Sequence, residues 1–241
     1  GTGAGKSSTQ AAVIGYRNQH TRGHIITIED PIEFVHQHNK SIVSQREVGV
    51  DTMSYRSALE NAMRQAPDVI QIGEVRTPET MKSALVFAET GHLCLATLHA
   101  NNTYQALQRI INLYPDDARD HLYMDLSMNL RAIISQRLIP NAQGNGSVPA
   151  VEIMLNSPMI SDLIMGGEIA DIREAMEKSS DEGMMTFDQS LFGLYENGFI
   201  NYDDAMRSAE SVNNLRLKIK LEGEAAKSKK SIGSTFDQIK F

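Results

Sequence analysis

Short apolar runs alternate with amphipathic stretches along the first part of the chain. Apolar, β-branched runs predict buried strands over His24–Glu29, Ser41–Arg46, Val69–Val75 and Leu93–Leu98. Apolar residues at helical spacing predict the helices before and between these runs, over Ser7–His20, Ser54–Gln65 and Thr77–Thr90. Strands that alternate with helices are typical of a mostly parallel sheet with helices on both faces. The pattern therefore predicts an α/β fold.

The second half of the chain carries helical spacing almost throughout, with Val148–Leu155 as the exception. The helices that it predicts cover Thr103–Leu113, Asp116–Leu138, Pro158–Met165, Ile169–Lys178, Phe187–Glu196, Tyr202–Ser211 and Asn213–Leu221. From Glu222 onward Lys, Ser and Gly dominate, which is typical of a disordered tail. We therefore divide the chain into an α/β core over 1–155, a helical region over 156–221 and a tail over 222–241.

Composition narrows the class of protein. The chain has 241 residues, of which 41% are apolar and 22% charged, so collagen-like and wholly disordered proteins are excluded. Its single cysteine, Cys94, allows neither a disulfide framework nor a four-cysteine zinc site, and it fits a reducing compartment. The net charge of −7 disfavours nucleic acid as the main partner, because phosphate backbones attract basic surfaces.

Glycines and one lysine crowd the first eight residues, GTGAGKSS. Gly5, Lys6 and Ser7 match the last three places of the phosphate-loop pattern, Gly-x-x-x-x-Gly-Lys-Ser/Thr. The first glycine of that pattern would precede Gly1, so we interpret the chain as a fragment that starts inside the motif. We expect Lys6 to reach the β- and γ-phosphates of a nucleotide and the Ser7 hydroxyl to complete the coordination of Mg²⁺. The alternative is a glycine-rich turn followed by a helix with an unrelated lysine.

Acidic residues follow two of the predicted strands. Ligands of open parallel sheets bind at the carboxyl ends of the strands, and phosphoryl transfer to water needs an acid that holds metal and a group that orients water. Glu74 is the candidate for the metal-holding acid, and one of Glu29, Asp30 and Glu33 for the group that polarises water. The alternative for each is an acidic surface turn.

Three further side chains are candidates on weaker grounds. His99 ends a predicted strand and is a candidate donor to the γ-phosphate, whereas His92 begins the same strand. Arg76 lies two residues after Glu74 and is a candidate for an electrostatic role. His36 and His38 resemble a metal-binding pair, but no further ligand set follows them, so we expect both to be solvated.

Four segments occur in the order seen in type IV pilus retraction ATPases, a family of the secretion ATPase superfamily that this chain resembles. They are the Walker A segment Gly3–Ser7, the aspartate box IEDPIEF, the Walker B segment IGEVR and the histidine box TGHLCLATLHANN. The resemblance continues through Gly183–Ala205. GEVRTPETM, DLSMNLRAIISQRLIP and NNLRLKIKL look closer to the accessory branch of the family. The related ATPases that assemble pili usually carry a four-cysteine zinc segment. Because this chain has one cysteine, it resembles them less.

The resemblance implies a RecA-like P-loop NTPase core that binds ATP and Mg²⁺. It implies a hexameric ring motor at the cytoplasmic base of the pilus, on the inner membrane, that drives pilus retraction and twitching motility. The implied partners are a paralogous retraction ATPase and an inner-membrane platform protein, with no nucleic acid. Relatives complete a neighbour's site with arginines from the region before the phosphate loop, so we expect the fragment alone to be deficient in hydrolysis.

Site residues follow from the matched motifs. Glu33 matches the water-activating acid, Glu74 matches the Walker B acid near Mg²⁺, and His92 and His99 match the histidine box. The nucleotide loop is matched by Gly3, Ala4, Gly5, Lys6, Ser7 and Ser8. Two other functions remain open: a nucleotide-binding ring subunit with regulatory or structural work and little hydrolysis, and a RecA-type nucleic-acid motor.

Overall fold

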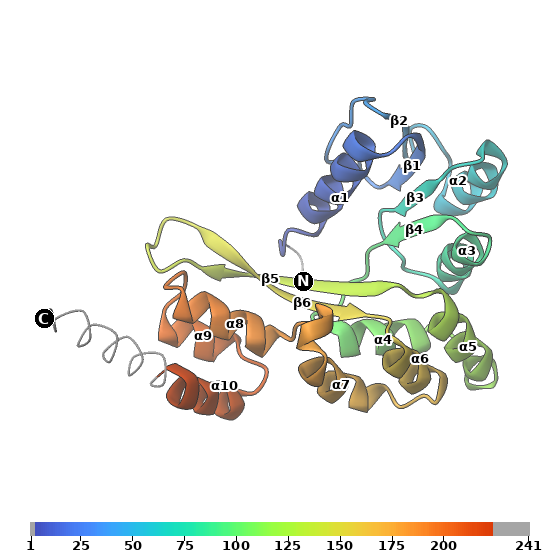
Figure 1. Cartoon of the computed structure of the whole chain (residues 1–241). Helices are drawn as coiled ribbons and strands as arrows, with labels where there is room; N and C mark the ends of the chain where they lie inside the picture. The colour runs from blue at the N-terminus through green and yellow to red at the C-terminus, as the bar shows by residue number, and fades with distance from the viewer. Residues whose placement is uncertain (1–2, 224–241) are drawn as a thin grey trace, which may run out of the picture.

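A four-stranded parallel sheet forms the first half of the computed structural model, which describes residues 3–223 (Figure 1). Its order is β2-β1-β3-β4, with every neighbouring pair parallel. The strands are β1 (Gly23–Glu29), β2 (Ser41–Glu47), β3 (Val69–Ile72) and β4 (Leu93–Ala96). The predicted parallel sheet is confirmed, although β3 and β4 end a few residues earlier than their apolar runs suggest.

Helices cover both faces of this sheet, because alternate residues of its strands point to opposite sides. Ile25 and Val69 pack with Ile14 of α1 on one face, and Ile26 and Ile70 pack toward α2 and α3 on the other. These helices span Lys6–His20 (α1), Tyr55–Ala62 (α2, extended by a 3₁₀ turn over Met63–Gln65) and Pro78–Glu89 (α3). The hydroxyls of Ser54 and Thr77 cap α2 and α3 by accepting hydrogen bonds from backbone N–H groups of the first turn.

The predicted helix over Asp116–Leu138 is wrong in its second half. A 3₁₀ turn (Asp116–Ala118) and helix α5 (Arg119–Asn129) occupy the first half, and strand β5 (Ala132–Pro140) occupies the second. β5 pairs antiparallel along its whole length with β6 (Ser147–Leu155). Isoleucines are β-branched and fit a pleated ladder well, so hairpin pairing overrides the helical spacing that we had counted.

The other helices lie where the spacing predicts them, with shifted ends. They are α4 (Thr103–Ile111), α6 (Pro158–Met165), α7 (Ile172–Lys178, after a 3₁₀ turn over Ile169–Asp171), α8 (Phe187–Glu196), α9 (Tyr202–Ser208) and α10 (Val212–Lys218). A 3₁₀ turn over Ser180–Glu182 precedes α8, and a π-helical segment over Ile219–Gly223 follows α10. Glu222 and Gly223, which we predicted to begin the tail, belong to that segment. Residues 224–241 lie outside the described part, so the rest of the tail stays a prediction.

The β5–β6 hairpin contributes to two apolar cores. Met154 joins the large cluster that runs from the sheet to α6 and α7, where Ile160 and Ile164 are fully buried. Ile139 joins a second cluster with Phe187 and other residues of α8 to α10. The division at residue 155 stays a prediction, but the packing makes the hairpin the common support of both regions. Among the described residues, no helix combines the length and the apolar character that crossing a membrane requires.

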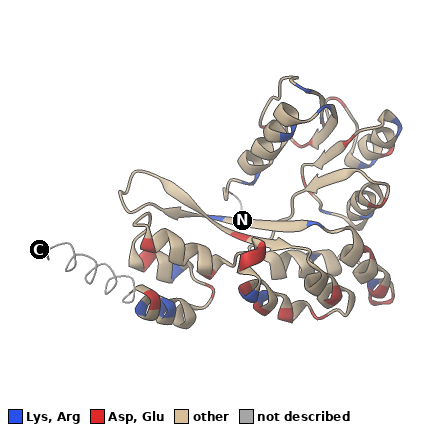
Figure 2. Ribbon diagram, viewed as in Figure 1, with Lys and Arg blue, Asp and Glu red and all other residues tan. Residues whose placement is uncertain are grey.

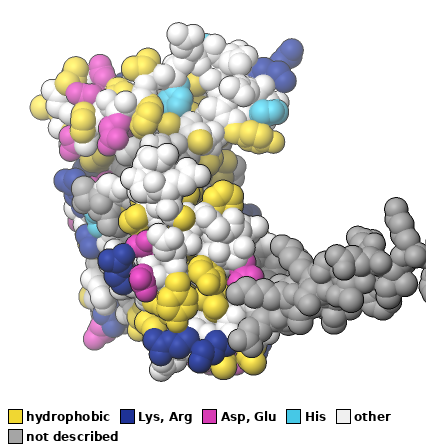
Figure 3. All heavy atoms as spheres, turned by 90° about the vertical axis from the view of Figure 1, so that its left-hand side faces the viewer, with side chains coloured by type: hydrophobic (Ala, Val, Ile, Leu, Met, Phe, Trp, Pro, Cys, Tyr) yellow, Lys and Arg dark blue, Asp and Glu magenta, His cyan; other side chains and the backbone are white. Residues whose placement is uncertain are grey.

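Charged residues lie mainly on the helices, where Lys and Arg are interspersed with Asp and Glu (Figure 2). On the side where the hairpin tip and α8 to α10 lie, hydrophobic side chains also remain at the surface between charged ones (Figure 3). Within the hairpin strands, Arg137 and Glu152 are the charged residues. Because the other residues of β5 and β6 are uncharged, Arg137 and Glu152 are expected to make specific polar contacts.

Candidate functional site

The phosphate-loop segment has the backbone that its glycines allow. Gly3 and Gly5 adopt left-handed φ angles of 76° and 83°, which other residues rarely adopt. Gly5 is the N-cap of α1 and has no side chain to block the approach of a ligand. α1 has 15 residues and no acidic residue in its first turn, so its positive end faces the loop without compensation from a carboxylate. The loop is therefore suited to bind an anion.

A cavity of about 490 Å³ lies against this loop, at the carboxyl ends of β1 and β3 and beside the segment that follows β4. It brings together most of the side chains that the sequence predicted. Those that line it are Gly3, Ala4, Gly5, Lys6, Ser7, Ser8, Glu29, Asp30, Glu33, Glu74 and His99. Segments as distant in the chain as those of Gly3 and His99 thus form one surface, because parallel strands end at the same edge of the sheet.

His99 links the lysine of the loop to Glu74. Its Nδ1 lies 3.3 Å from Nζ of Lys6, and its Nε2 lies 2.8 Å from Oε1 of Glu74. A neutral imidazole with its hydrogen on Nε2 satisfies both contacts, since it accepts from the ammonium and donates to the carboxylate. A movement of Lys6 would therefore change the contact of His99.

Glu74 is held as a carboxylate. Burial by itself raises its pKa, but the hydrogen bond from Arg76 and the neighbouring His99 outweigh this and hold the pKa below the ordinary value of 4.5. Arg76 itself does not line the cavity, but its Nη2 lies 2.6 Å from Oε2 of Glu74. Both carboxylate oxygens of Glu74 therefore have a partner.

The acidic residues after β1 have different surroundings. Glu29 accepts hydrogen bonds from the Thr27 hydroxyl at 2.6 Å and from Nε2 of Gln45 at 3.1 Å, which gives it a structural role. Glu33 faces the cavity, and within the described part of the chain its carboxylate forms no hydrogen bond or ion pair with protein. Asp30 also lines the cavity, and within the described residues its carboxylate likewise has no protein partner, so Asp30 and Glu33 are the two acids free to contact water.

Tyr55 and Thr97 shape the Walker B turn, and the sequence analysis missed both. The Tyr55 hydroxyl and the backbone at the end of β1 crowd Gly73, where an added Cβ would lie 2.9 Å from that hydroxyl and 3.0 Å from the carbonyl oxygen of Ile28. The Thr97 hydroxyl donates to the carbonyl oxygen of Gly73. Burial and the nearby charge of Asp30 raise the pKa of Tyr55 to about 12, so it stays a neutral phenol. These contacts set the direction of Glu74.

Gln136 of β5 is a third contributor that sequence reasoning missed. Its amide touches the phosphate loop, since Nε2 donates to the carbonyl oxygen of Ala4 at 2.8 Å. The helical spacing predicts a helix here, whereas Ile134, Gln136 and Leu138 lie on one face of β5 and alternate with residues of the other face, which is the period of a strand. This alternation is the signal in the sequence from which the strand could have been predicted.

His92 and His36 have different positions relative to the cavity. His92 lies at the opposite end of β4, where Nδ1 contacts the Thr90 hydroxyl at 3.0 Å, and it does not line the cavity. His36, expected to be solvated, lines the cavity, while Nδ1 of His38 accepts from the Val43 N–H at 3.1 Å. His36 and His38 therefore do not act as a pair.

Known proteins that resemble this chain include pilus and secretion ATPases. Residues 1–187 match the family described as type II/IV secretion system protein. The chain is 56% identical over 224 residues to the type IV pilus ATPase PilU of Pseudomonas aeruginosa, covering 93% of this chain and 59% of that protein. It is 41% identical over 213 residues to PilT, a type IV pilus retraction ATPase of the same organism, covering 88% of this chain and 62% of that protein.

Solved structures give the same result. The crystal structure of the pilus retraction motor PilT with bound ADP matches with a TM-score of 0.83 and 43% identity, over 89% of this chain and 61% of that one. The ATPase DotB of Legionella pneumophila matches with a TM-score of 0.77 and 26% identity, over 86% of this chain and 57% of that one. The chain thus spans about three fifths of the length of these relatives.

Proposed function

The chain belongs to the family of type II/IV secretion system proteins, and we propose that it is an ATP-hydrolysing motor subunit that drives type IV pilus retraction. The likeness to PilT and DotB supports the RecA-like P-loop core. The observation that carries the proposal is that the phosphate loop, Glu33, Glu74 and His99 line one cavity. The relative PilT was solved with ADP, the product that such a site would release.

Each part of the cavity has a role in this reaction. The N–H groups of the loop and the positive end of α1 bind phosphate oxygens, and Lys6 neutralises the charge on the outer phosphates. Glu33 orients water for attack on the γ-phosphate. Loss of that phosphate changes the surroundings of Lys6, and His99 passes the change to Glu74 at the end of the neighbouring strand.

Magnesium fits this donor set. When bound, Mg²⁺ neutralises charge on the β- and γ-phosphates, with the Ser7 hydroxyl and Glu74 on the protein side. Among the described residues, no cluster of three His, Cys, Asp or Glu side chains offers a complete cation site. This suits Mg²⁺, which keeps several waters and takes substrate phosphates as ligands rather than a cage of protein side chains.

Within the family we propose the accessory role. The identity of 56% to a PilU, against 41% to the PilT of the same organism, supports the PilU-like branch that the sequence indicated. We further propose a homohexamer that works with a paralogous retraction ATPase and an inner-membrane platform protein, peripheral to the cytoplasmic face of the inner membrane.

A second candidate is a nucleotide-binding ring subunit that regulates a paralogue and hydrolyses little ATP itself. The observation that favours it is that Arg76 and His99 occupy both carboxylate oxygens of Glu74. ATP turnover of the full-length protein, measured alone and with its paralogue, separates the two. Substantial turnover alone supports the motor, and turnover that depends on the paralogue supports the regulator.

The test of the nucleotide site is the affinity of the full-length protein for Mg·ADP, measured by calorimetry. Lys6→Ala is expected to weaken binding or turnover by about 10²-fold, the usual effect of removing a group that stabilises phosphate charge. Lys82→Ala is the matched control, because Lys82 is exposed on α3 and does not line the cavity. An unchanged affinity and turnover in Lys6→Ala would refute the site.

A further inference from the structure

The side chain of Gln136 holds the phosphate loop at two places. Its Nε2 donates to the carbonyl oxygen of Ala4 at 2.8 Å, and its Oε1 accepts from the Thr9 hydroxyl at 2.9 Å. Ala4 and Thr9 lie on the two sides of Gly5, where an added Cβ would come within 2.6 Å of Nε2 of Gln136. The side-chain amide of Gln136, which comes from the distant β5–β6 hairpin, therefore holds the phosphate loop in place at the start of α1.

Arg137, the next residue of β5, makes its contacts on the other face of the hairpin, as successive side chains of a strand do. Its Nη1 donates to the carbonyl oxygen of Ser208 at 3.0 Å, and its Nη2 lies 2.8 Å from Oε1 of Glu210. The guanidinium also lies 4.1 Å from the ring centre of Phe187 in α8. One strand thus joins the phosphate loop to the segment between α9 and α10.

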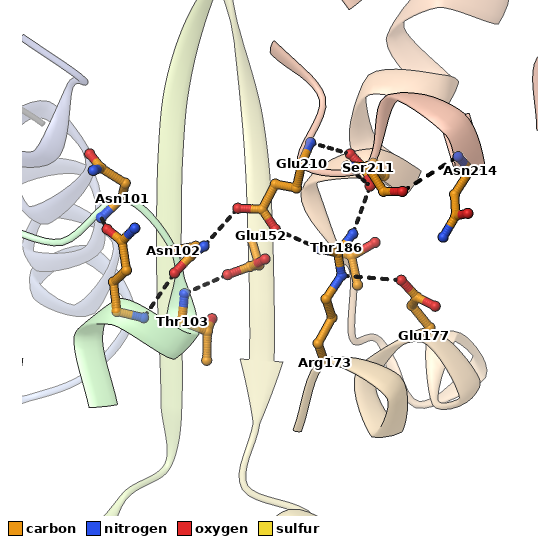
Figure 4. Close-up of polar contacts among 12 residues, drawn as sticks. Asn101, Asn102, Thr103, Glu152, Arg173, Glu177, Thr186, Glu210, Ser211 and Asn214 are labelled. Carbon is orange, nitrogen blue, oxygen red and sulfur yellow. Dashed lines mark hydrogen bonds and ion pairs between the residues drawn. The ribbon is translucent and has the colours of Figure 1, made fainter. Parts of the chain in front are cut away.

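A second connection from the cavity ends on the same carboxylate. Asn102, three residues after His99, donates from Nδ2 to Oε1 of Glu210 at 2.7 Å (Figure 4). The neighbouring Asn101 offers its carbonyl oxygen to Nη2 of Arg137 at 3.3 Å. The histidine-box loop and β5 therefore both contact Glu210, whose side chain is 11% exposed.

Arg173 of α7 completes the cluster around Glu210 (Figure 4). Its Nη1 lies 3.4 Å from Oε2 of Glu210, and its Nη2 lies 2.7 Å from Oδ2 of Asp188. Asp188 in turn accepts hydrogen bonds from the backbone N–H groups of Glu210 at 2.8 Å and Ser211 at 3.0 Å. The carboxylates of Glu210 and Asp188 are 11% and 12% exposed, and a charge so little exposed is costly when its partner is removed, so the cluster holds the segment in one arrangement.

We propose that Gln136 and Arg137 couple the phosphate loop to the segment Ser208–Ser211, so that nucleotide bound at the loop stabilises this segment. The proposal rests on the nucleotide site proposed above and adds two positioning residues to it. Coupling of this kind is reciprocal, so a change that loosens the segment must weaken nucleotide binding by the same factor. Arg137 is the informative position, because its recorded contacts are with the segment, Asn101 and Phe187 rather than with the loop.

The experiment measures two quantities in the full-length protein, the affinity for Mg·ADP and the hydrogen exchange of the Glu210 and Ser211 amides. In the unsubstituted protein, saturating Mg·ADP is expected to slow exchange of both amides. Arg137→Lys keeps the charge but loses the forked contacts, and we expect it to weaken Mg·ADP binding about 2- to 30-fold and to remove the nucleotide-dependent slowing. Gln136→Met is expected to remove the slowing even when ADP saturates the site. Ile134→Val is the matched control, on an exposed position of the same strand.

The outcomes separate the coupling from the nucleotide site. If the unsubstituted protein binds Mg·ADP but the two amides do not respond, or if Arg137→Lys binds ADP with unchanged affinity, the coupling is wrong and the nucleotide site stands. If the unsubstituted protein does not bind Mg·ADP, both are wrong. Should Gln136→Met fail to fold, Arg137→Lys alone decides, since its effect on ADP affinity requires transmission through β5 or the histidine-box loop.

Discussion

Nε2 of His99 lies 2.8 Å from Oε1 of Glu74, which joins the residues that follow two neighbouring strands, β3 and β4. The contact puts an imidazole ring between the carboxylate and the lysine of the phosphate loop. It also leaves Glu74 with two donors, so the carboxylate depends on them for its charge and direction.

The Glu74 contacts predict a specific pH dependence of stability. Because its pKa is lowered in the folded protein, the carboxylate stabilises the fold above pH 4.5, and this contribution is lost as pH falls through the lowered pKa. Glu74→Gln is expected to lower the melting temperature at pH 7 and to approach the unsubstituted protein as the pH falls below the lowered pKa. Thermal unfolding across this range measures the difference. If the two melting temperatures differed by the same amount at pH 7 and at acidic pH, the assigned ion pair would be contradicted.

Glu33→Gln is expected to lower ATP turnover in the full-length protein by about 10²- to 10⁴-fold, because the amide cannot accept a proton from the attacking water. Binding of Mg·ADP should change little, since Glu33 is assigned to water. Glu89→Gln is the matched control, an exposed carboxylate on α3 outside the cavity. Normal turnover in Glu33→Gln would transfer the role to another acid of the cavity.

Gly73→Ala and Gly15→Ala are expected to have opposite effects on stability. The Cβ at position 73 would crowd the Ile28 carbonyl oxygen at 3.0 Å and the Tyr55 hydroxyl, at a cost of about 1–3 kcal/mol in the free energy of unfolding. Position 15 lies inside α1 with open space around its added Cβ, so alanine should stabilise by about 0.5–1 kcal/mol. Urea unfolding checks both. If both substitutions changed the free energy of unfolding equally, the close contacts around Gly73 would be wrong.

Cys94 is expected to react slowly with thiol reagents in the folded protein. Burial in β4 raises the pKa of its thiol to about 12, so at pH 8 the thiolate is about 10³-fold scarcer than for an exposed cysteine of pKa near 8.5. Because the chain has one cysteine, labelling by a maleimide reports this site alone. Labelling should become fast in denaturant, and fast labelling without denaturant would show that β4 opens readily.

The parallel sheet could be predicted because its signals are local. The apolar runs of β1 and β3, the hydroxyl caps of α2 and α3, and the glycines of the phosphate loop each act over a few residues. β5 could not be placed in this way. Its residues satisfy both helical and extended spacing, and only pairing with β6 decides between them.

The sequence by itself determined that a phosphate loop precedes strands that end in acids, and from this the edge of the sheet where the chemistry would lie. Only the tertiary structure decided the surroundings of these acids, since Thr27 and Gln45 donate to Glu29, whereas the carboxylates of Asp30 and Glu33 have no protein partner among the described residues. It also decided that Gln136 supports the loop. The physical reason is that motifs specify local backbone and chemistry, whereas the partner of a side chain depends on how distant segments pack.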